Sequence, residues 1–356
     1  MIRIGIAGIG FMGMVHYLTY QRLHGVLVAA LCEQDPKRLA GDWREIQGNF
    51  GPVGKKMDLS GIARYCDLDE MLADESLDVI DVTLPPGLHA EIAIKALRAG
   101  KHVFCEKPMA LTPRDCDRMS AAAAKANRLL MVGHVLPFYP EYAWAYKTIQ
   151  SGKYGRLLGG SFRRVISDPQ WLPNYWSADR VGGPMLDLHV HDAHFIRLLF
   201  GMPDKVTSQG RMRGELAQFW HTQFHYSDQP YVVEATSGTI DQQGRPFEHG
   251  FEIHLERATL AFDFAVIDGV GRMLLEPTLF EGKGLDDKGR VKHPKLSDGD
   301  PMNAFRHELR EIVRAIRTNQ PSPILDGNLA RDAIVICQKQ TESLRKDRSV
   351  KLGGKK

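Results

Sequence analysis

The first 133 residues alternate short apolar runs with segments of helical pattern, and this alternation limits the possible folds more than any other feature of the chain. Five short, mostly apolar runs have the pattern of buried strands: IRIGIAG, VLVAALCE, LDVIDVTL, KHVFCEK and RLLMVG. Helical segments such as GLHAEIAIKALRAG lie between them. Strands that alternate with helices form parallel sheets. The sequence therefore predicts a doubly wound α/β domain with a parallel sheet over residues 1–133.

The rest of the chain has a different pattern. Between about residues 203 and 280, β-rich runs such as YVVEATSGTI and ATLAFDFAV follow one another with turns but no helical segment between them. Strands in direct succession favour an antiparallel sheet. Two helical segments, NAFRHELREIVRAIR and LARDAIVICQKQTESLR, close the chain. We expect a C-terminal α+β domain on an open, mostly antiparallel sheet over residues 134–350, with a short basic tail over 351–356.

Composition narrows the class of protein. At 356 residues, 43% hydrophobic and 25% charged, the chain is typical of a soluble globular protein with two domains. A net charge of +3 gives no long-range attraction to nucleic acid or to an anionic membrane, so neither is an expected partner. No apolar run approaches the roughly twenty residues of a membrane span, and no signal peptide is expected. Five cysteines without a CxxC pair fit a cytoplasmic protein.

The run GIGFMG directly follows the first predicted strand and opens the first predicted helix. In this GxGxxG pattern Gly8 permits a tight turn, Gly10 lets a ligand approach the backbone, and Gly13 allows close helix–strand packing. The N–H groups at the helix start attract the pyrophosphate of a dinucleotide. A glycine-rich turn without a ligand is the alternative, and the position between strand and helix favours the Rossmann interpretation. We expect these glycines to bind the cofactor, together with Phe11 and Met12.

The cofactor preference depends on Glu33, which ends the second predicted strand 20 residues after Gly13. A carboxylate at this place accepts hydrogen bonds from the ribose 2′-hydroxyl of NAD and repels the 2′-phosphate of NADP. Lys37 and Arg38 follow and could meet a phosphate, although an exposed helix face explains both more simply. The sequence therefore favours NAD over NADP.

A lysine and a helix carry the candidate chemistry. Lys107 ends the fifth predicted strand, at the sheet edge where open α/β folds bind their ligands. In LDLHVHDAHF, Asp187 and His191 are four residues apart and share one face of a helix, with His194 close to that face. A carboxylate beside an imidazole orients the ring and supports a general base near neutral pH.

Two alternatives concern the neighbouring residues. His189, His191, Asp192 and His194 come close to the HxHxDH ligand run of metallo-β-lactamase-type hydrolases, but the aspartate is one place early and the pattern is helical, so no metal is expected. The preceding loop WLPNYW offers aromatic faces that suit sugar rings or simply pack, and it supplies Trp171, Tyr175 and Trp176 as candidates. Arg163 and Arg164 could meet an anionic substrate group, although a solvated strand is the simpler explanation.

The motifs together resemble those of the glucose–fructose oxidoreductase/inositol dehydrogenase (Gfo/Idh/MocA) family along nearly the whole chain. They are IGIAGIGFMG, the PxxxH…EKP block in LPPGLHAEIAIKALRAGKHVFCEKPMALT, the run KYGRLLGGSF, the GG…DxxxH helix in GGPMLDLHVHDAHFIRLLFG, and FRHELREIVRAIRTNQPSPI. EKP combined with DxxxH is a specific signature.

The resemblance implies that Lys107 and His191 are catalytic and that Asp187 completes the site. It also implies a cis Lys107–Pro108 bond and dimers or tetramers formed through the second domain's sheet. The cofactor would lie along a set of residues near the strand ends, which are Thr83, Leu84, Pro85, His89, Glu106 and Lys107. The chain departs from the family at Glu33, commonly an aspartate, and at Pro137, where many members carry a basic residue.

The leading hypothesis is an oxidoreductase that moves a hydride between nicotinamide and a secondary alcohol of a sugar, polyol or sugar derivative. His191 would accept the hydroxyl proton, Lys107 would stabilise the developing alkoxide, and Asp187 would orient His191 or bind a neighbouring hydroxyl. Lys107, Trp171, Trp176, Asp187 and His191 are the expected substrate contacts. One alternative is a lyase or glycosidase that oxidises its sugar transiently with no net redox change. Another is a nucleotide-binding sensor without activity. The presence of Lys107, Asp187 and His191 together argues against this alternative.

Overall fold

The computed structural model describes residues 1–353 except 49, 50, 171, 173, 246, 283, 285, 286, 297–299 and 301. The chain divides into two compact units, each built from two stretches of sequence. The first comprises Met1–Phe138 and Gly299–Arg331, and the second Tyr139–Asp298 and Asp332–Lys356. No described helix combines the length and the apolar character that a membrane crossing requires.

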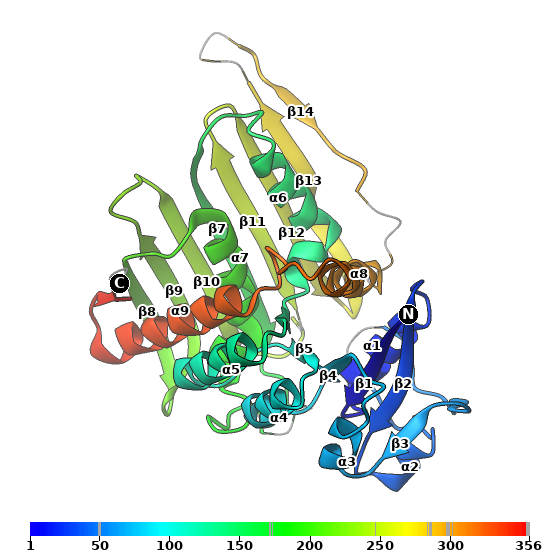
Figure 1. Cartoon of the computed structure of the whole chain (residues 1–356). Coiled ribbons are helices and arrows are strands. Elements are labelled where there is room, and N and C mark those ends of the chain that lie inside the picture. Colours follow the sequence, from blue (N-terminus) through cyan, green and yellow to red (C-terminus); the bar gives the residue numbers. More distant parts are fainter. Residues whose placement is uncertain are drawn as a thin grey trace. The chain divides into compact units, whose positions relative to one another are not determined.

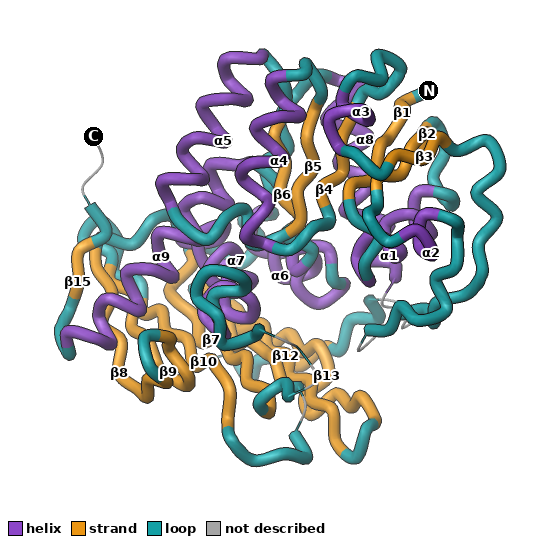
Figure 2. The backbone as a smooth tube through the Cα atoms, turned by 90° about the horizontal axis from the view of Figure 1, so that it is seen from below, coloured by secondary structure: helices purple, strands orange, loops and turns teal. Residues whose placement is uncertain are grey.

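The first unit contains a parallel sheet of six strands in the order β3-β2-β1-β4-β5-β6 (Figure 1 and Figure 2). The strands are β1 Ile2–Ala7, β2 Val26–Cys32, β3 Ala63–Tyr65, β4 Val79–Val82, β5 His102–Glu106 and β6 Leu130–Gly133. The order reverses between β1 and β4, and ligands of such sheets bind beyond the strand ends at this reversal. The predicted doubly wound domain is confirmed, with β3 as an additional short strand.

The helices of this unit are α1 Phe11–Tyr20, α2 Pro36–Leu39, α3 Leu68–Leu72, α4 Pro86–Arg98, α5 Pro113–Ala126, the 3-10 turn η1 Leu136–Phe138, and α8 Met302–Thr318. Apolar residues of α8 join the core that β1 and β4 supply: Leu309, Ile312 and Val313 pack in one cluster with Ile4 and Val79. The expectation that residues 134–350 form one domain is therefore wrong for 299–331. An amphipathic helix shows in its sequence which face is buried but not against which partner.

The second unit contains a sheet of nine strands in the order β14-β13-β12-β11-β7-β10-β9-β8-β15, and Figure 1 labels all of them except β15. The strands are β7 Leu157–Ser167, β8 Lys205–Arg213, β9 Leu216–His225, β10 Val232–Ile240, β11 Glu248–Leu255, β12 Ala258–Ile267, β13 Val270–Glu281, β14 Arg290–Lys292 and β15 Val350–Lys351. Of the described pairings only β7 with β10 is parallel. The mostly antiparallel sheet is thus confirmed.

Helices of the second unit pack on one face of this sheet. They are α6 Pro140–Gln150, the π-helical turn η2 Met185–His189, α7 Val190–Phe200, and α9 Gly327–Lys346, which begins in the first unit. Tyr142 of α6 contacts Phe251 and Phe262, and Asp192 of α7 bonds Arg164 of β7. This packing fixes η2, which carries the candidate residue Asp187, and α7, which carries His191.

Candidate active site

The glycine-rich turn has the geometry that a dinucleotide requires. Gly8 has φ +96, a left-handed conformation that side chains rarely adopt. A Cβ on Gly13 would lie 2.2 Å from the Gly8 carbonyl oxygen, so only glycine permits this closeness of α1 to the turn. At Gly10, by contrast, a Cβ would meet no described atom within 4 Å. The open space over Gly10 is where a pyrophosphate would approach the helix start.

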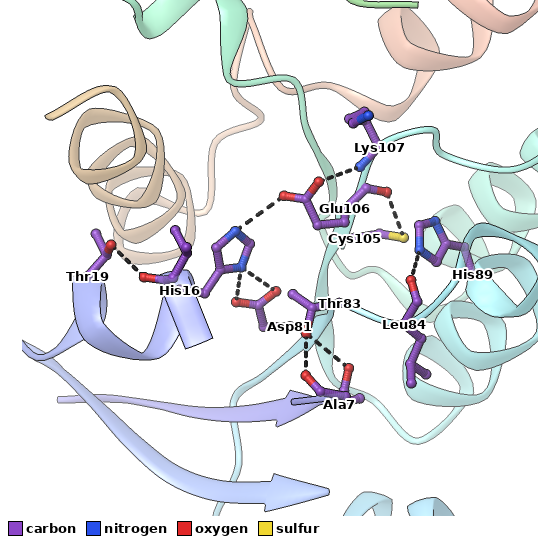
Figure 3. A network of polar contacts seen from close by, with 12 residues as sticks. Ala7, His16, Thr19, Asp81, Thr83, Leu84, His89, Cys105, Glu106 and Lys107 are labelled. Carbon is purple, nitrogen blue, oxygen red and sulfur yellow. Dashed lines mark hydrogen bonds and ion pairs between the residues drawn. The ribbon is translucent and has the colours of Figure 1, made fainter. Parts of the chain in front are cut away.

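Other predicted cofactor residues surround this turn. The Thr83 hydroxyl donates to the Gly8 carbonyl oxygen at 2.7 Å and so ties the end of β4 to the turn (Figure 3). Phe11 and Met12 open α1 and are partly exposed, and Leu84 and Pro85 lead into α4.

Glu33 follows β2 and its carboxylate is held by backbone N–H groups. Ile9 donates to Oε2 at 2.7 Å, while Gln34 and Asp35 donate to Oε1 at 2.8 and 3.0 Å. Arg38 donates to the Ile9 carbonyl at 3.3 Å, so it lies over the glycine turn rather than on a purely solvated face. The carboxylate oxygens keep lone pairs for ribose hydroxyls, and these residues together fit a nicotinamide dinucleotide.

Lys107 follows β5 and is half-buried, and its peptide bond to Pro108 is cis, as the family resemblance implied. His89 of α4 is fully buried and supports this segment rather than lining an open surface. Its Nδ1 lies 2.8 Å from the Pro108 carbonyl oxygen and its Nε2 lies 2.7 Å from that of Leu84. Burial lowers the pKa of His89. The ring therefore joins the lysine loop to the loop after β4.

The first unit also contains a buried polar cluster that was not predicted from the sequence. His16 of α1 lies between the carboxylates of Asp81 and Glu106, at 2.9 Å from its Nδ1 and 3.2 Å from its Nε2 (Figure 3). Glu308 of α8 and Tyr20 of α1 are also buried and belong to the same electrostatic group. The available signal was the position of Asp81 and Glu106 inside apolar strand runs.

The structure separates the residues of the Asp–His helix as the periodicity predicted. From 183 to 196 only Asp187 and His191 are not buried. Asp187 lies in the π-helical turn η2 and His191 in the first turn of α7. Such turns occur often at functional sites. His194, one turn beyond His191, is fully buried.

The other members of this run serve the core. His189 contacts Ser237 at 2.8 Å and Gln340 at 3.1 Å, and burial lowers its pKa to about 4. Asp192 accepts from the guanidinium of buried Arg164 at 2.6 Å. Among the described residues no group of three or more His, Cys, Asp or Glu side chains is arranged to hold a metal ion. The cation that Asp192 meets is thus an arginine.

The aromatic loop is partly described. Trp171 lies outside the described residues. Trp176 donates from its indole nitrogen to Asp168 at 3.1 Å, and the guanidinium of Arg213 lies 4.4 Å from its ring centroid. Tyr175 is buried. These contacts favour the packing interpretation for Tyr175 and Trp176. Arg163 pairs with Glu248 at 2.7 Å and also with Asp263, so it is bound within the sheet.

Comparisons with known proteins agree with this architecture. Residues 2–134 match the oxidoreductase family with an NAD-binding Rossmann fold, and residues 142–261 match the GFO/IDH/MocA C-terminal domain. The chain is 32% identical to inositol 2-dehydrogenase 2 of Saccharopolyspora erythraea over 88% of this chain and 85% of the relative. It is 28% identical to 2,7-anhydro-N-acetylneuraminate hydratase of Mediterraneibacter gnavus over 80% and 83%.

A solved structure supports the fold. Levoglucosan dehydrogenase in complex with NADH superposes with a TM-score of 0.82 and 21% identity, over 99% of this chain and 100% of that one. The two matching family domains cover the glycine turn, the lysine loop and the Asp–His helix in one chain. The protein therefore belongs to the Gfo/Idh/MocA family of oxidoreductases, with an NAD-binding Rossmann domain at its N-terminus.

Proposed function

We propose that this protein is a dehydrogenase that transfers a hydride between nicotinamide and a secondary alcohol of a sugar, polyol or sugar derivative. The observation that carries the proposal is that, from 183 to 196, only Asp187 and His191 are partly exposed, in an otherwise buried helical segment. Residues that only pack in the core do not need contact with solvent, whereas a pair that transfers protons must reach its substrate. Inositol 2-dehydrogenase among the relatives supports the substrate class.

The catalytic roles that we propose fall on three side chains. The bound cofactor supplies the hydride acceptor or donor. His191 accepts the proton of the substrate hydroxyl, and Asp187 orients the His191 ring or binds a neighbouring hydroxyl. The Lys107 ammonium donates a hydrogen bond to the same hydroxyl oxygen and stabilises its developing negative charge.

NAD is the cofactor that we propose over NADP. Glu33 places a carboxylate within the glycine turn, 2.7 Å from the Ile9 nitrogen, where a 2′-phosphate would meet a like charge. Arg38, which also contacts Ile9, is the residue on which NADP binding would depend. Titrating the protein with NADH and NADPH separately tests the preference. Equal affinities would refute it.

The main experiment is a spectroscopic screen of hexoses, pentoses, inositols and anhydro-sugars with NAD and with NADP. With the best substrate, Lys107→Ala and His191→Asn should each lower kcat by about a hundredfold or more. Lys125→Ala is the matched control, because Lys125 is an exposed lysine at the end of α5. Turnover near that of the wild type in Lys107→Ala, with cofactor binding intact, would refute the assigned role.

A second function is favoured by one relative. The hydratase of Mediterraneibacter gnavus belongs to a reaction class without net oxidation. We therefore keep as the alternative a lyase or glycosidase that oxidises its sugar transiently and then returns the hydride. Release of NADH during turnover separates the two functions: a dehydrogenase accumulates one NADH per product, and the alternative accumulates none.

We further propose a homodimer or homotetramer formed through the nine-stranded sheet, in the cytoplasm. Strand β13 exposes consecutive apolar side chains, with Met273 and Leu274 each 50% and Leu275 39% exposed. Exposed apolar patches of this kind mark interfaces. Light scattering should give a mass of two or four chains for the wild type. Leu274→Glu with Leu275→Glu should lower that mass, and a monomeric wild type would refute the proposal.

A further inference from the structure

We propose that His16 is a positioning residue for Lys107 and acts through the carboxylate of Glu106. This inference rests on the catalytic role proposed for Lys107. It assigns a function to a buried histidine on the helix that opens with the glycine turn, and it makes α1 part of the support of the lysine loop.

The contacts form a continuous path from α1 to the lysine. His16 Nδ1 lies 2.9 Å from Asp81 Oδ2, so the ring is anchored on β4. Its Nε2 lies 3.2 Å from Glu106 Oε1 at the end of β5. The second oxygen of that carboxylate, Oε2, accepts the backbone N–H of Lys107 at 3.1 Å. Figure 3 shows His16, Glu106 and Lys107 in this order along one line of contacts. The Glu106 carboxylate thus lies between the His16 ring, at ion-pair distance, and the backbone of Lys107.

Packing leaves the Glu106 carboxylate little freedom. A Cβ on Gly133 of β6 would lie 2.7 Å from Glu106 Oε1, so the carboxylate fills the space that this glycine leaves. Phe104 of β5 stacks on the His16 ring, with centroids 5.4 Å apart and planes at 27°. Glu106 itself is 7% exposed. A change at His16 therefore has few ways to relax other than through Glu106.

The charges explain why a histidine is suited to this place. Burial disfavours the imidazolium, but the charges and hydrogen bonds of Asp81 and Glu106 outweigh it and hold the pKa of His16 well above its ordinary value. Burial and the negative charge of Glu106 raise the pKa of Glu308 well above its usual range. The cluster is thus a cation between two carboxylates. Without a neighbour at the place of His16 Nε2, the Glu106 carboxylate would turn toward the Lys107 ammonium.

Two substitutions divide the contacts of His16. The amide nitrogen of Asn reaches about as far as Nδ1 and that of Gln about as far as Nε2. His16→Asn therefore keeps a donor toward Asp81 and loses the one toward Glu106, whereas His16→Gln does the reverse. Thr19→Val is the matched control, because Thr19 is buried on the same helix and its hydroxyl bonds only the Val15 carbonyl among the described residues.

We expect His16→Asn to lower kcat with the best sugar by about tenfold to a hundredfold, because small displacements of a catalytic group have costs of this order. The dissociation constant of NADH should change less than about threefold, since Glu33 and the glycine turn are untouched. His16→Gln should recover most of kcat, and Thr19→Val should retain all of it. Equal loss of kcat in the Asn and Gln variants, or a kcat that follows only the melting temperature across all three, would overturn the inference.

A double-mutant cycle with Glu106→Gln tests the path itself. If His16 acts through Glu106, the double variant with His16→Asn should be no slower than Glu106→Gln alone. Multiplicative losses would show that His16 acts by another route. Lys107→Ala separates this inference from the proposed function. An active Lys107→Ala would refute the role of the lysine, whereas an inactive Lys107→Ala beside a fully active His16→Asn would refute only the positioning role.

Discussion

Two glycines of the same turn should respond in opposite ways to alanine. Gly10 has φ −86, which any residue adopts, and its new Cβ would meet nothing within 4 Å. Gly13 would place its Cβ 2.2 Å from the Gly8 oxygen, against the 3.0 Å below which such contacts essentially never fall. We expect Gly10→Ala to weaken cofactor binding without loss of stability, and Gly13→Ala to destabilise the first unit.

The magnitudes follow from these distances. Ala is favoured over Gly within a helix by about 0.5–1 kcal/mol, but relieving the overlap at Gly13 costs about 1–3 kcal/mol, so destabilisation wins. For Gly10→Ala the reduced entropy of the unfolded chain contributes about 0.4–1 kcal/mol of stability. Its Cβ occupies the approach of the pyrophosphate, and we expect at least a roughly tenfold loss of NADH affinity, about 1.4 kcal/mol.

Urea unfolding and NADH fluorescence titration measure the two effects separately. Gly284→Ala is the control, because this glycine of the second unit also has open space around its Cβ and no positive φ. Wild-type NADH affinity in Gly10→Ala would refute the placement of the pyrophosphate over that residue. Wild-type stability in Gly13→Ala would refute the closeness of α1 to the turn.

Further predictions concern buried charges. Glu308→Gln should raise the unfolding free energy relative to the wild type, and this gain should grow by about 1.4 kcal/mol per pH unit from pH 4.5 up to the folded-state pKa. In this pH range the wild type releases a proton from Glu308 when it unfolds, and the variant does not. Unfolding at pH 5 and 8 measures this, and a pH-independent difference would contradict it. Asp192→Ala should cost about 3–5 kcal/mol in chemical denaturation, since it leaves Arg164 buried and unpaired. Asp42→Asn removes one partner of an exposed ion pair with Arg44, so it should lower the unfolding free energy much less. Similar losses in the two variants would refute the importance of burial for the Arg164–Asp192 pair.

The sequence predicted best what is local. The glycine turn and the apolar strands are contiguous patterns, so both the doubly wound fold and the place of Gly10 followed from them. Helical spacing paired Asp187 with His191, the two residues of this run that are partly exposed, but it did not predict the π-helical turn. Strand β3 was missed because a strand of three residues, none of them buried, carries no periodic signal.

What the sequence could not show depends on contacts between distant residues. His16 and Asp81 are 65 positions apart, and nothing near either residue indicates the other. The assignment of α8 failed for the same reason: its apolar face is evident, but its partners lie near the N-terminus. His189 contacts Gln340, which is 151 positions away in the sequence, and this contact shows that the histidine belongs to the core.

The return of residues 299–331 to the first unit has a consequence for how the protein is made. Ribosomal synthesis supplies β1 to β6 long before α8, so until then the core around Ile4 and Val79 lacks the side chains of Leu309, Ile312 and Val313. The N-terminal part of the first unit therefore keeps apolar surface uncovered while every strand of the nine-stranded sheet except β15 is translated. Chaperone dependence and sensitivity to premature termination should accordingly concentrate in the first unit, although its sequence begins the chain.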